Sequence, residues 1–448
     1  MIGLPRRRLL LAAAALAAAP GLRAAPLALP ALALRERRLA NGLHVIAAAE
    51  PGGGTVAVQM WYRVGSKDDP PGRSGFAHLF EHMMFKSTRH LASEAFDRLT
   101  EDVGGSNNAF TADDTTAYLN EVPSNHLERL LWAEAERLSN LNVDAANFAS
   151  ERDVVKEEYR ERVEADPYGR LFNALPELGF IEHPYRRPGI GNLAELDAAT
   201  LDDVRAFHRT YYRPDNVALV VVGDFDPADL DRWVDRHLGR LPRPEGSVPR
   251  VRSAEPRRRE HRRVALTAPT VPLPALALLW QGPPAAHADA PALKVAAALL
   301  ADGDSSRLNE ALVYRARSAQ SAGFEPLLNA DAGLLVGYAI ASGPRPAASL
   351  EAPLLAEIRR LAEGPLPAAE LEKVRLKLLT AALAERQTAA GRAMALGNAL
   401  VMAGDVRAAD AELARLQAVS AGDVRRVLRT HVLQAHRVSA TYTQAPTS

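Results

Sequence analysis

Two histidines and one glutamate lie close together in the segment His78-Leu79-Phe80-Glu81-His82. If this segment is helical, His78 and His82 lie one turn apart on the same face, where both imidazoles can bind a single metal ion. Zinc with three protein ligands keeps a position open for water, and a carboxylate such as Glu81 can take the proton of that water as it attacks a carbonyl. The segment therefore predicts a hydrolytic metal centre, in the inverted order of the commoner His-Glu-x-x-His motif.

The alternative is a helix that carries ordinary surface histidines. The residues around the trio are largely apolar: Phe76, Leu79, Phe80, Met83 and Phe85. The His-Glu-His trio would therefore be partly buried, and burying three such groups without a partner is costly. This argues for a bound metal.

A third protein ligand must come from another part of the sequence. Glu151 and Glu158 are seven residues apart in a helical stretch, so their carboxylates share a face, whereas Glu157 points away from it. Glu158 could complete the metal centre, and Glu151 could hydrogen-bond a ligating histidine from behind. Spacing alone leaves the choice among the acidic residues of this stretch open.

Hydrophobic spacing predicts the elements that position these residues. Strands are predicted at 56–64, 109–121 and 217–222, and helices at 75–85, 127–138 and 147–163. Strands mixed with long helices indicate an α+β fold in which a sheet and its helices form two layers.

The second half of the chain resembles the first when position 200 is aligned with position 420. Segment 200–210 then matches 420–430, and each copy is followed by an apolar β-branched run, as in a helix that leads into a closing strand. The region between the copies is rich in proline and arginine, which is typical of a solvated linker. We therefore expect an N-terminal zinc-bearing domain at 34–240, a linker at 241–263 and a homologous C-terminal domain without a metal site at 264–445.

The first residues have the composition of a secretory signal peptide. Three arginines at 6–8 precede an apolar run at 9–19 and then small residues at 24–25. We expect residues 1–25 to be removed, which would leave a periplasmic or secreted protein with no stable membrane span. A retained membrane anchor is the alternative.

Composition excludes several classes of protein. The 448 residues include 54 basic and 54 acidic side chains and no cysteine. A net charge of zero argues against a nucleic-acid binder, since nothing attracts a phosphate backbone at long range. The lack of cysteine excludes disulfides, thiolate metal ligands and a cysteine nucleophile.

Four segments together are similar to the active, zinc-bearing subunits of the pitrilysin/insulinase family of zinc metallopeptidases, which are inverzincins of the His-x-x-Glu-His type. These segments are 65–68, 76–85, 104–111 and 151–158, and the resemblance extends over 35–443. It implies the short two-domain form of the family. In that form, two homologous α/β-layered domains of the LuxS/MPP-like metallohydrolase type, arising from an internal repeat, enclose a cleft.

The resemblance also implies roles for individual residues. His78, His82 and Glu158 would hold one Zn²⁺ per chain, Glu81 would be the general base, and Glu151 would support the site. Imidazole and carboxylate ligands alone would also accept manganese or cobalt.

A further implication concerns the substrate. Asn108, Ala109 and Phe110 would lie on a sheet edge where an extended peptide substrate pairs as an added strand. A Gly/Asn turn that enters a strand would account for the same residues.

The second half departs from the family pattern. In the alignment of the two halves, the positions of the metal centre correspond to a set that cannot form one: Ala298, Ala301, Asp302 and Leu378. The resemblance also places an Arg and a Tyr, seven residues apart, in the second half of active homodimers, where the pair reaches the substrate carbonyl. Tyr314 and Ser321 stand at these positions here. We therefore expect a zinc-less homologous subunit as the partner in a heterodimer, or else a homodimer.

These observations predict an exported zinc-dependent endopeptidase that hydrolyses peptide bonds in extended peptides or unfolded protein segments. Zinc-bound water would attack the carbonyl, with Glu81 as general base. A non-catalytic scaffold or assembly subunit of the same fold is the alternative, and a metal-binding protein without hydrolytic activity is a third hypothesis.

Overall fold

The structure of the chain is a computed structural model that describes residues 32–445. The signal peptide predicted at 1–25 lies outside the described residues. In the part of the chain that is described, no helix is both long and apolar enough to cross a membrane.

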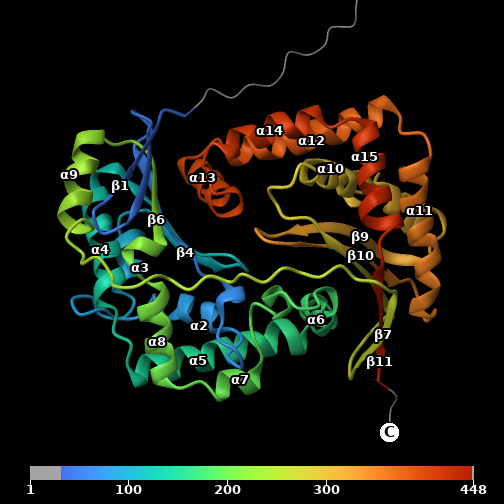
Figure 1. Cartoon of the computed structure of the whole chain (residues 1–448), viewed down its shortest axis with the longest axis horizontal. Coiled ribbons are helices and arrows are strands. Elements are labelled where there is room, and N and C mark those ends of the chain that lie inside the picture. The colour runs from blue at the N-terminus through green and yellow to red at the C-terminus, as the bar shows by residue number, and fades with distance from the viewer. Residues whose placement is uncertain (1–31, 446–448) are drawn as a thin grey trace, which may run out of the picture. The chain divides into compact units, whose positions relative to one another are not determined.

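Six strands form the sheet of the first half, in the order β1-β2-β6-β3-β5-β4 (Figure 1). They are β1 (Leu34–Arg38), β2 (His44–Ala49), β3 (Thr55–Tyr62), β4 (Ser106–Thr111), β5 (Thr116–Pro123) and β6 (Val217–Gly223). The valine-rich β6 lies inside the sheet, and all its residues are buried because both faces are covered. β4 ends the order, so one of its edges has no neighbouring strand in residues 32–445.

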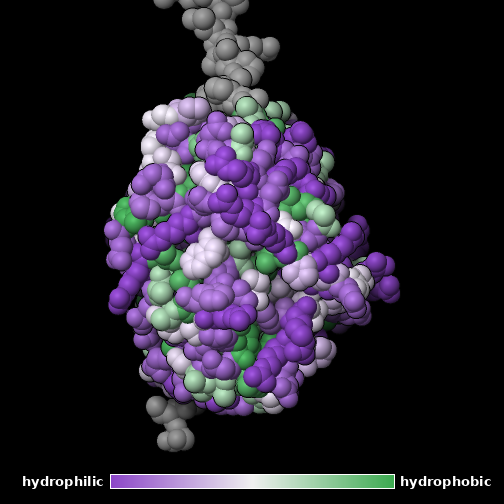
Figure 2. All heavy atoms as spheres, turned by 90° about the vertical axis from the view of Figure 1, so that its left-hand side faces the viewer, coloured by the Kyte–Doolittle hydropathy of each residue, from purple (hydrophilic) through white to green (hydrophobic). Residues whose placement is uncertain are grey.

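One face of this sheet shares a hydrophobic core with helices of the same half. The helices of the first half are α2 (Phe76–Met83), α3 (Ala95–Glu101), α4 (Leu127–Asn140), α5 (Ala145–Tyr159), α6 (Gly169–Gly179), α7 (Leu193–Asp197), α8 (Leu201–Tyr211) and α9 (Pro227–His237). The helices predicted at 75–85, 127–138 and 147–163 correspond to α2, α4 and α5. The outer face near α9 is mostly hydrophilic (Figure 2), and Arg37 there pairs with Asp231 and Asp235.

Five strands form the second sheet, in the order β7-β11-β8-β10-β9. They are β7 (Arg262–Ala268), β8 (Ala275–Gly282), β9 (Ala319–Leu328), β10 (Gly333–Ala341) and β11 (Arg437–Gln444). The helices of this half are α10 (Ala290–Ala301), α11 (Glu351–Glu363), α12 (Ala368–Glu385), α13 (Ala389–Ala403), α14 (Ala408–Ala418) and α15 (Ala421–Leu428).

Apart from β1, which adds an antiparallel strand to the first sheet, the two sheets have the same pairing pattern, and this confirms the α+β fold with an internal repeat. Each sheet contains one parallel pair, β2 with β6 and β7 with β11, followed by three antiparallel pairings. The helices that lead into the closing strands also begin alike. Thr200 and Asp203 form a capping box at α8, and Ser420 and Asp423 form one at α15.

The two halves exchange one helix each. α6, from the first half, packs on one face of the second sheet, where Leu171 and Leu175 share a core with Leu279 and Tyr442. α13, from the second half, packs on the first sheet at the face opposite to α2. These two helices stand at equivalent places in the repeat, since α6 begins at 169 and α13 begins at 389, the same shift as from 200 to 420.

The single strand predicted at 109–121 is wrong. The chain forms two strands here, β4 and β5, joined by a tight turn in which Ala112 N–H donates to the carbonyl of Thr115 (2.8 Å). Asp113 and Asp114 in this turn accept hydrogen bonds from Ser66 and Lys67 (2.6 Å each). These contacts with a segment distant in the sequence fix the turn. The spacing of apolar residues within 109–121 could not predict them.

The predicted linker contains neither helix nor strand from 241 to 261, and β7 begins at 262. It runs past both sheets in Figure 1. The domain boundaries at 34–240, 241–263 and 264–445 stay a prediction.

Candidate metal centre

Helix α2 begins at a turn that glycine adopts readily. Gly75, directly before α2, has φ +88°, and a Cβ there would lie 2.8 Å from the carbonyl oxygen of Ile190. The buried carboxyl group of Asp69 accepts hydrogen bonds from the backbone N–H groups of Gly75 (2.7 Å) and Ala77 (2.8 Å). Burial raises the pKa of Asp69 to about 7. The start of α2, and with it the predicted site, is thereby fixed in place.

α2 buries one face and leaves a polar strip beside α5. Its buried residues are Phe76, Ala77, Leu79, Phe80 and Met83. His78, Glu81 and His82 are only partly buried. Of these, His78 and His82 face Glu158 of α5, as the prediction of a metal centre requires.

The structure brings His78, His82 and Glu158 together. The Nε2 atoms of His78 and His82 each lie 3.4 Å from Oε2 of Glu158. One ligand atom from each residue lies within 4.8 Å of the other two. Zinc bonds of about 2.1 Å at tetrahedral angles separate ligand atoms by about 3.4 Å. The donor set therefore fits a zinc ion, whereas 3.4 Å exceeds the usual length of an N–H···O hydrogen bond.

The two imidazoles have different electrostatic surroundings. Burial lowers the pKa of His78 to about 4, and the neighbouring His82 acts in the same direction. Burial also disfavours the charged form of His82, but its contacts with Glu151 and Glu158 raise its pKa to about 9. The lowered pKa of His78 favours its neutral form, which is the form that binds metals.

Glu81 lies beside this group and is held from the sheet. The hydroxyl of Thr111, at the end of β4, donates a hydrogen bond of 2.5 Å to Oε2 of Glu81. Burial raises the pKa of Glu81, although this hydrogen bond opposes the shift. A partly buried carboxylate with a raised pKa is suited to exchange protons near neutral pH.

Glu151 lies behind His82, as its spacing from Glu158 suggested. Its Oε2 is 3.6 Å from Nδ1 of His82, and its Oε1 is 2.7 Å from Nζ of Lys86. Glu151 can therefore orient the His82 ring. Arg162 lies 2.8 Å from Oε1 of Glu158 and holds that carboxylate from the other side.

Three contacts of the site were missed by sequence reasoning. Lys86 and Arg162 each lie four residues after a predicted ligand, His82 and Glu158, so helical spacing could have indicated both. Thr111 could not have been found in this way, because the predicted strand 109–121 hid the turn that ends β4.

Asn108, Ala109 and Phe110 lie in β4, at the edge of the first sheet. The N–H of Ala109 donates to the side-chain oxygen of Asn108 (2.8 Å). The ring of Phe110 packs edge-to-face on Trp61, with centroids 5.6 Å apart. A contact of these residues with substrate stays a prediction.

The second half lacks an equivalent group. Ala298 and Ala301 lie on α10, Leu378 lies on α12, and Asp302 pairs with Lys377 (2.6 Å). Within residues 32–445, His78, His82 and Glu158 are the one set of such side chains close enough to share a metal ion.

The position expected to carry the family's Arg holds Tyr314, and the position expected to carry its Tyr holds Ser321. Tyr314 is half exposed, and Ser321 lies in β9. Arg315, next to Tyr314, is also mostly exposed.

Comparisons with known proteins agree with this fold. Residues 44–192 match the family described as insulinase (peptidase family M16), and residues 198–378 match the peptidase M16 inactive domain. The zinc protease PqqE of Helicobacter pylori is 31% identical over 340 residues, which are 75% of this chain and 77% of that protein.

Solved structures have the same fold. A protease from Helicobacter pylori superimposes with a TM-score of 0.88 at 28% identity, over 92% of this chain and 99% of that one. The periplasmic protease PqqL from Escherichia coli superimposes with a TM-score of 0.73 at 19% identity, over 93% of this chain and 48% of that one.

Fold and site together define a two-domain metallopeptidase. The chain belongs to the insulinase family, peptidase family M16.

Proposed function

We propose that the chain is an exported zinc endopeptidase that cuts extended peptides or unfolded protein segments. The observation that carries this proposal is the 3.4 Å spacing between Oε2 of Glu158 and the Nε2 atoms of His78 and His82, which suits a tetrahedral ion. The name of the relative from Helicobacter pylori, a zinc protease, supports zinc as that ion.

Each residue of the centre has a distinct role in this proposal. His78, His82 and Glu158 hold one zinc ion per chain. When bound, zinc supplies a Lewis acid that makes water more acidic and polarises the peptide carbonyl. Glu81 accepts the proton of the attacking water and later donates it to the leaving nitrogen. The hydroxyl of Thr111 holds Oε2 of Glu81, which leaves Oε1 to carry the proton.

Glu151 acts on this centre through His82. Its carboxylate faces Nδ1 of His82, and Lys86 balances its charge. The pKa of Glu151 is lowered by these contacts, although burial opposes them, so it stays ionised. An ionised carboxylate at this place keeps Nε2 of His82 directed at the metal position.

The substrate would bind along the free edge of β4. A peptide strand added there would form main-chain hydrogen bonds, which recognise extended shape rather than sequence. The N–H of Ala109 already has a replaceable partner, the side chain of its neighbour Asn108. Most main-chain groups of a folded protein are already paired, so extended or unfolded segments are the expected substrates.

The test compares Glu81→Gln with Glu157→Gln, a matched change at an exposed carboxylate one residue from Glu158. Both variants should bind one zinc ion per chain, measured by elemental analysis. Cleavage of an unstructured, internally quenched peptide should fall about 10²- to 10⁴-fold in Glu81→Gln and stay unchanged in Glu157→Gln. Full turnover by Glu81→Gln would contradict the proposal.

A partner subunit is part of the proposal. Because Tyr314 and Ser321 stand where the Arg and Tyr were expected, we propose that a zinc-less homologous subunit supplies that pair in a heterodimer. A homodimer is the alternative. Adding the homologue to the zinc-loaded chain should give a 1:1 complex by mass photometry and raise turnover, whereas full turnover by this chain alone would contradict the need for it.

A non-catalytic scaffold is the second candidate function, and the absent Arg and Tyr are the observation in its favour. A zinc-loaded heterodimer that cuts no peptide would support it.

Export is proposed from the composition of residues 1–25. The structural neighbour PqqL from Escherichia coli is described as a periplasmic protease, which is compatible with this location. Sequencing the N-terminus of protein from the periplasmic fraction should find a start near Ala25. Recovery of the uncut chain in the membrane fraction would favour the retained anchor.

A further inference from the structure

Two hairpin turns, one from each half of the chain, meet close to Glu81. The β4–β5 turn, residues 112–115, directly follows Thr111, whose hydroxyl donates a hydrogen bond to Glu81. The β9–β10 turn, residues 329–332, joins the two strands at the equivalent end of the second sheet. The second half therefore contacts the segment that carries Thr111.

Asp113 in the β4–β5 turn is bound by both halves. Its Oδ1 accepts a hydrogen bond from the hydroxyl of Ser66 (2.6 Å), and its Oδ2 accepts one from the side-chain amide of Asn329 (2.5 Å). Burial raises the pKa of Asp113, and these two donors oppose the shift. Each oxygen of this carboxyl group thus has one donor, and the two donors come from different halves of the chain.

Asp114, the next residue of the turn, is buried and accepts three hydrogen bonds. Lys67 and the hydroxyl of Tyr185 donate to its Oδ1 (2.6 Å each), and the N–H of Ala330 in the β9–β10 turn donates to its Oδ2 (2.8 Å). Lys67 also pairs with Asp331 (2.8 Å). Because a buried acceptor that loses its donor destabilises the fold, the β9–β10 turn is needed to satisfy the β4–β5 turn.

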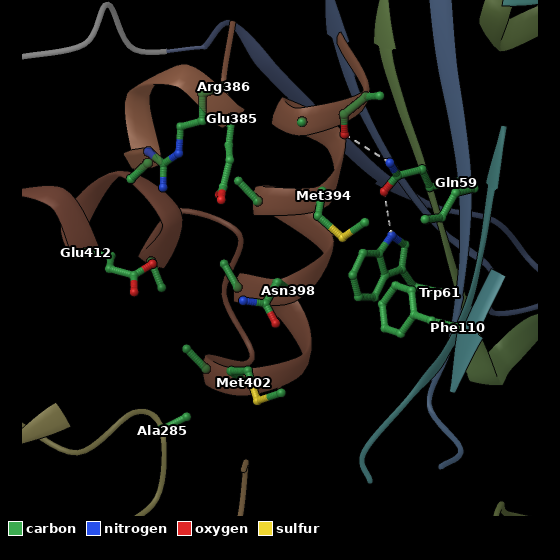
Figure 3. A pocket seen from close by; sticks show the side chains of 18 of the residues that line it. Gln59, Trp61, Phe110, Ala285, Glu385, Arg386, Met394, Asn398, Met402 and Glu412 are labelled. Atoms are coloured by element: carbon green, nitrogen blue, oxygen red, sulfur yellow. Dashed lines mark hydrogen bonds between the residues drawn. The ribbon is translucent and has the colours of Figure 1, made fainter. Parts of the chain in front are cut away.

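The second half also contacts the first sheet from its other face, through α13 (Figure 3). Phe110 of β4 packs on Trp61, and Gln59 accepts a hydrogen bond from Nε1 of Trp61 (3.0 Å) and donates one to a carbonyl of α13 (3.1 Å). Gly397 of α13 allows this approach, since a Cβ there would lie 2.0 Å from the Trp61 ring. Successive side chains of a strand point to opposite faces, so these contacts do not reach the hydroxyl of Thr111.

The β4–β5 turn therefore determines where the hydroxyl of Thr111 lies. Asp113 is two residues after Thr111, so a displaced turn also displaces the end of β4. The hydrogen bond from Thr111 to Oε2 of Glu81 is 2.5 Å long, and a displacement would lengthen it and allow the carboxylate to rotate. A misplacement of about 1 Å in an active site can lower the rate about 10²-fold.

We propose that the β9–β10 turn of the second half positions the general base of the first half. Asn329 is the positioning residue: its amide binds Asp113, and the β4–β5 turn then keeps Thr111 against Glu81. The inference deepens the proposed function and rests on it, because Glu81 is the general base only in that function. It gives the second half, in which the equivalent positions hold no metal ligands, a part in the chemistry of its own chain.

The first test measures cleavage of an unstructured, internally quenched peptide by the zinc-loaded chain, with its homologue added. Asn329→Ala removes one donor to Asp113. It should lower kcat about tenfold and leave KM and zinc content unchanged, because neither the edge of β4 nor the metal ligands are altered. Gln320→Ala, at an exposed position of β9, is the matched control and should leave kcat unchanged. An unchanged kcat in Asn329→Ala would overturn the inference.

A double-mutant cycle tests whether Asn329 acts through Thr111. Thr111→Val removes the hydroxyl and keeps the shape of the side chain. In that background Asn329→Ala should lower kcat by less than about twofold, because the contact that Asn329 maintains is already lost. A general loss of stability would lower kcat equally in both backgrounds, and this outcome would overturn the inference. If Asn329→Ala does not fold, Asn329→Ser, which keeps a hydroxyl donor, replaces it in the cycle.

Hydrogen exchange separates this inference from the proposed function. If the zinc-loaded chain cuts no peptide, with or without its homologue, the proposed function fails. Exchange of the amides in the β4–β5 turn, measured by mass spectrometry, then tests the link between the two turns. Exchange about tenfold faster in Asn329→Ala than in Gln320→Ala would support the link, and equal exchange in the two variants would overturn it.

Discussion

Helices α2 and α10 follow equivalent strands, β3 and β8, but have opposite relations to their surroundings. In α10 every residue except Lys294 and Ala301 is buried, because α12, α14 and α15 pack around it. α2 buries one face only and leaves His78, Glu81 and His82 in a partly exposed strip. The same position of the repeat therefore serves packing in one half and chemistry in the other.

The helices that supply the third ligand differ in the same way. Glu151 and Glu158 on α5 correspond, in the alignment of the two halves, to Leu371 and Leu378 on α12. Leu371 is buried in the second core and Leu378 packs against it. Polar groups that face a core lower the free energy of unfolding unless a ligand satisfies them. The first half therefore keeps carboxylates that reduce its stability, and a bound metal would compensate for this loss.

The largest effect on zinc binding and turnover is expected when Glu158 in the first half is replaced by leucine, the residue at the equivalent position of the second half. Glu158→Leu removes a ligand, so zinc content should fall from one per chain to near zero by elemental analysis. Peptide turnover should fall at least about 1000-fold, since the metal and the general base act together. The reverse change, Leu378→Glu, should add no second metal, because Ala298 and Ala301 offer no ligands. Full zinc content in Glu158→Leu would break the comparison.

Removing the support of His82 should have a smaller effect. Glu151→Gln keeps the shape of the side chain but not its charge, so zinc affinity should fall about 10- to 100-fold. Competition with a chromophoric chelator measures this affinity. Glu157→Gln, at an exposed carboxylate of the same helix, should leave it unchanged, and equal affinities in the two variants would remove Glu151 from the site.

Sequence reasoning predicted the residues that share a helix face better than those brought together by turns. The four-residue spacing of His78 and His82 and the seven-residue spacing of Glu151 and Glu158 depend only on helix geometry. The structure places His78, His82 and Glu158 around one point and Glu151 behind His82. Thr111 reaches Glu81 only because Asp113 and Asp114 turn the chain by bonding to Ser66 and Lys67. That turn depends on tertiary contacts, which local patterns do not contain.

The exchange of α6 and α13 between the two halves could not be predicted from the sequence either. The repeat predicted two similar halves, and the pairing order of the two sheets confirms this. It gave no sign that α6 covers the second sheet and α13 the first, because apolar faces do not specify which sheet they meet. The close approach of Gly397 to Trp61 results from that exchange, so no sequence pattern indicated it.

Helices α13 and α6 differ at one position where α13 approaches the first sheet closely. Position 397 on α13 is glycine because the helix meets Trp61, whereas the equivalent position on α6 is Glu177. Gly397→Ala should lower the free energy of unfolding by about 3 kcal/mol through overpacking. Urea denaturation measures this.

Gly422→Ala is the matched change, since its Cβ would meet only Ser420 Oγ at 3.5 Å. It should leave stability unchanged or raise it by about 0.5 kcal/mol. Equal effects of Gly397→Ala and Gly422→Ala would mean that the close approach of α13 to Trp61 does not limit the interface.

The smallest effect concerns a position at which the second half carries a buried carboxylate and the first half an apolar side chain. Glu351 on α11 corresponds to Leu131 on α4, which lies in the first core. Arg437 (2.6 Å) and Ser439 (3.0 Å) donate hydrogen bonds to Oε1 of Glu351. Burial alone would raise the pKa of Glu351, but these donors hold it below its ordinary value.

Glu351→Gln should therefore lower the free energy of unfolding by about 1.5 kcal/mol at pH 7, whereas Glu363→Gln, at the exposed end of the same helix, should have little effect. A carboxyl whose pKa is lower in the folded state contributes stability above its unfolded pKa of about 4.3 and loses it as the pH falls through its folded pKa. The difference between the unchanged chain and Glu351→Gln should thus close as the pH falls below about 4. Urea denaturation at a series of pH values measures this difference. A difference that stays constant as the pH falls below about 4 would contradict the prediction. It would mean that Glu351 stabilises the second half through its shape, as Leu131 does in the first, and not through its charge.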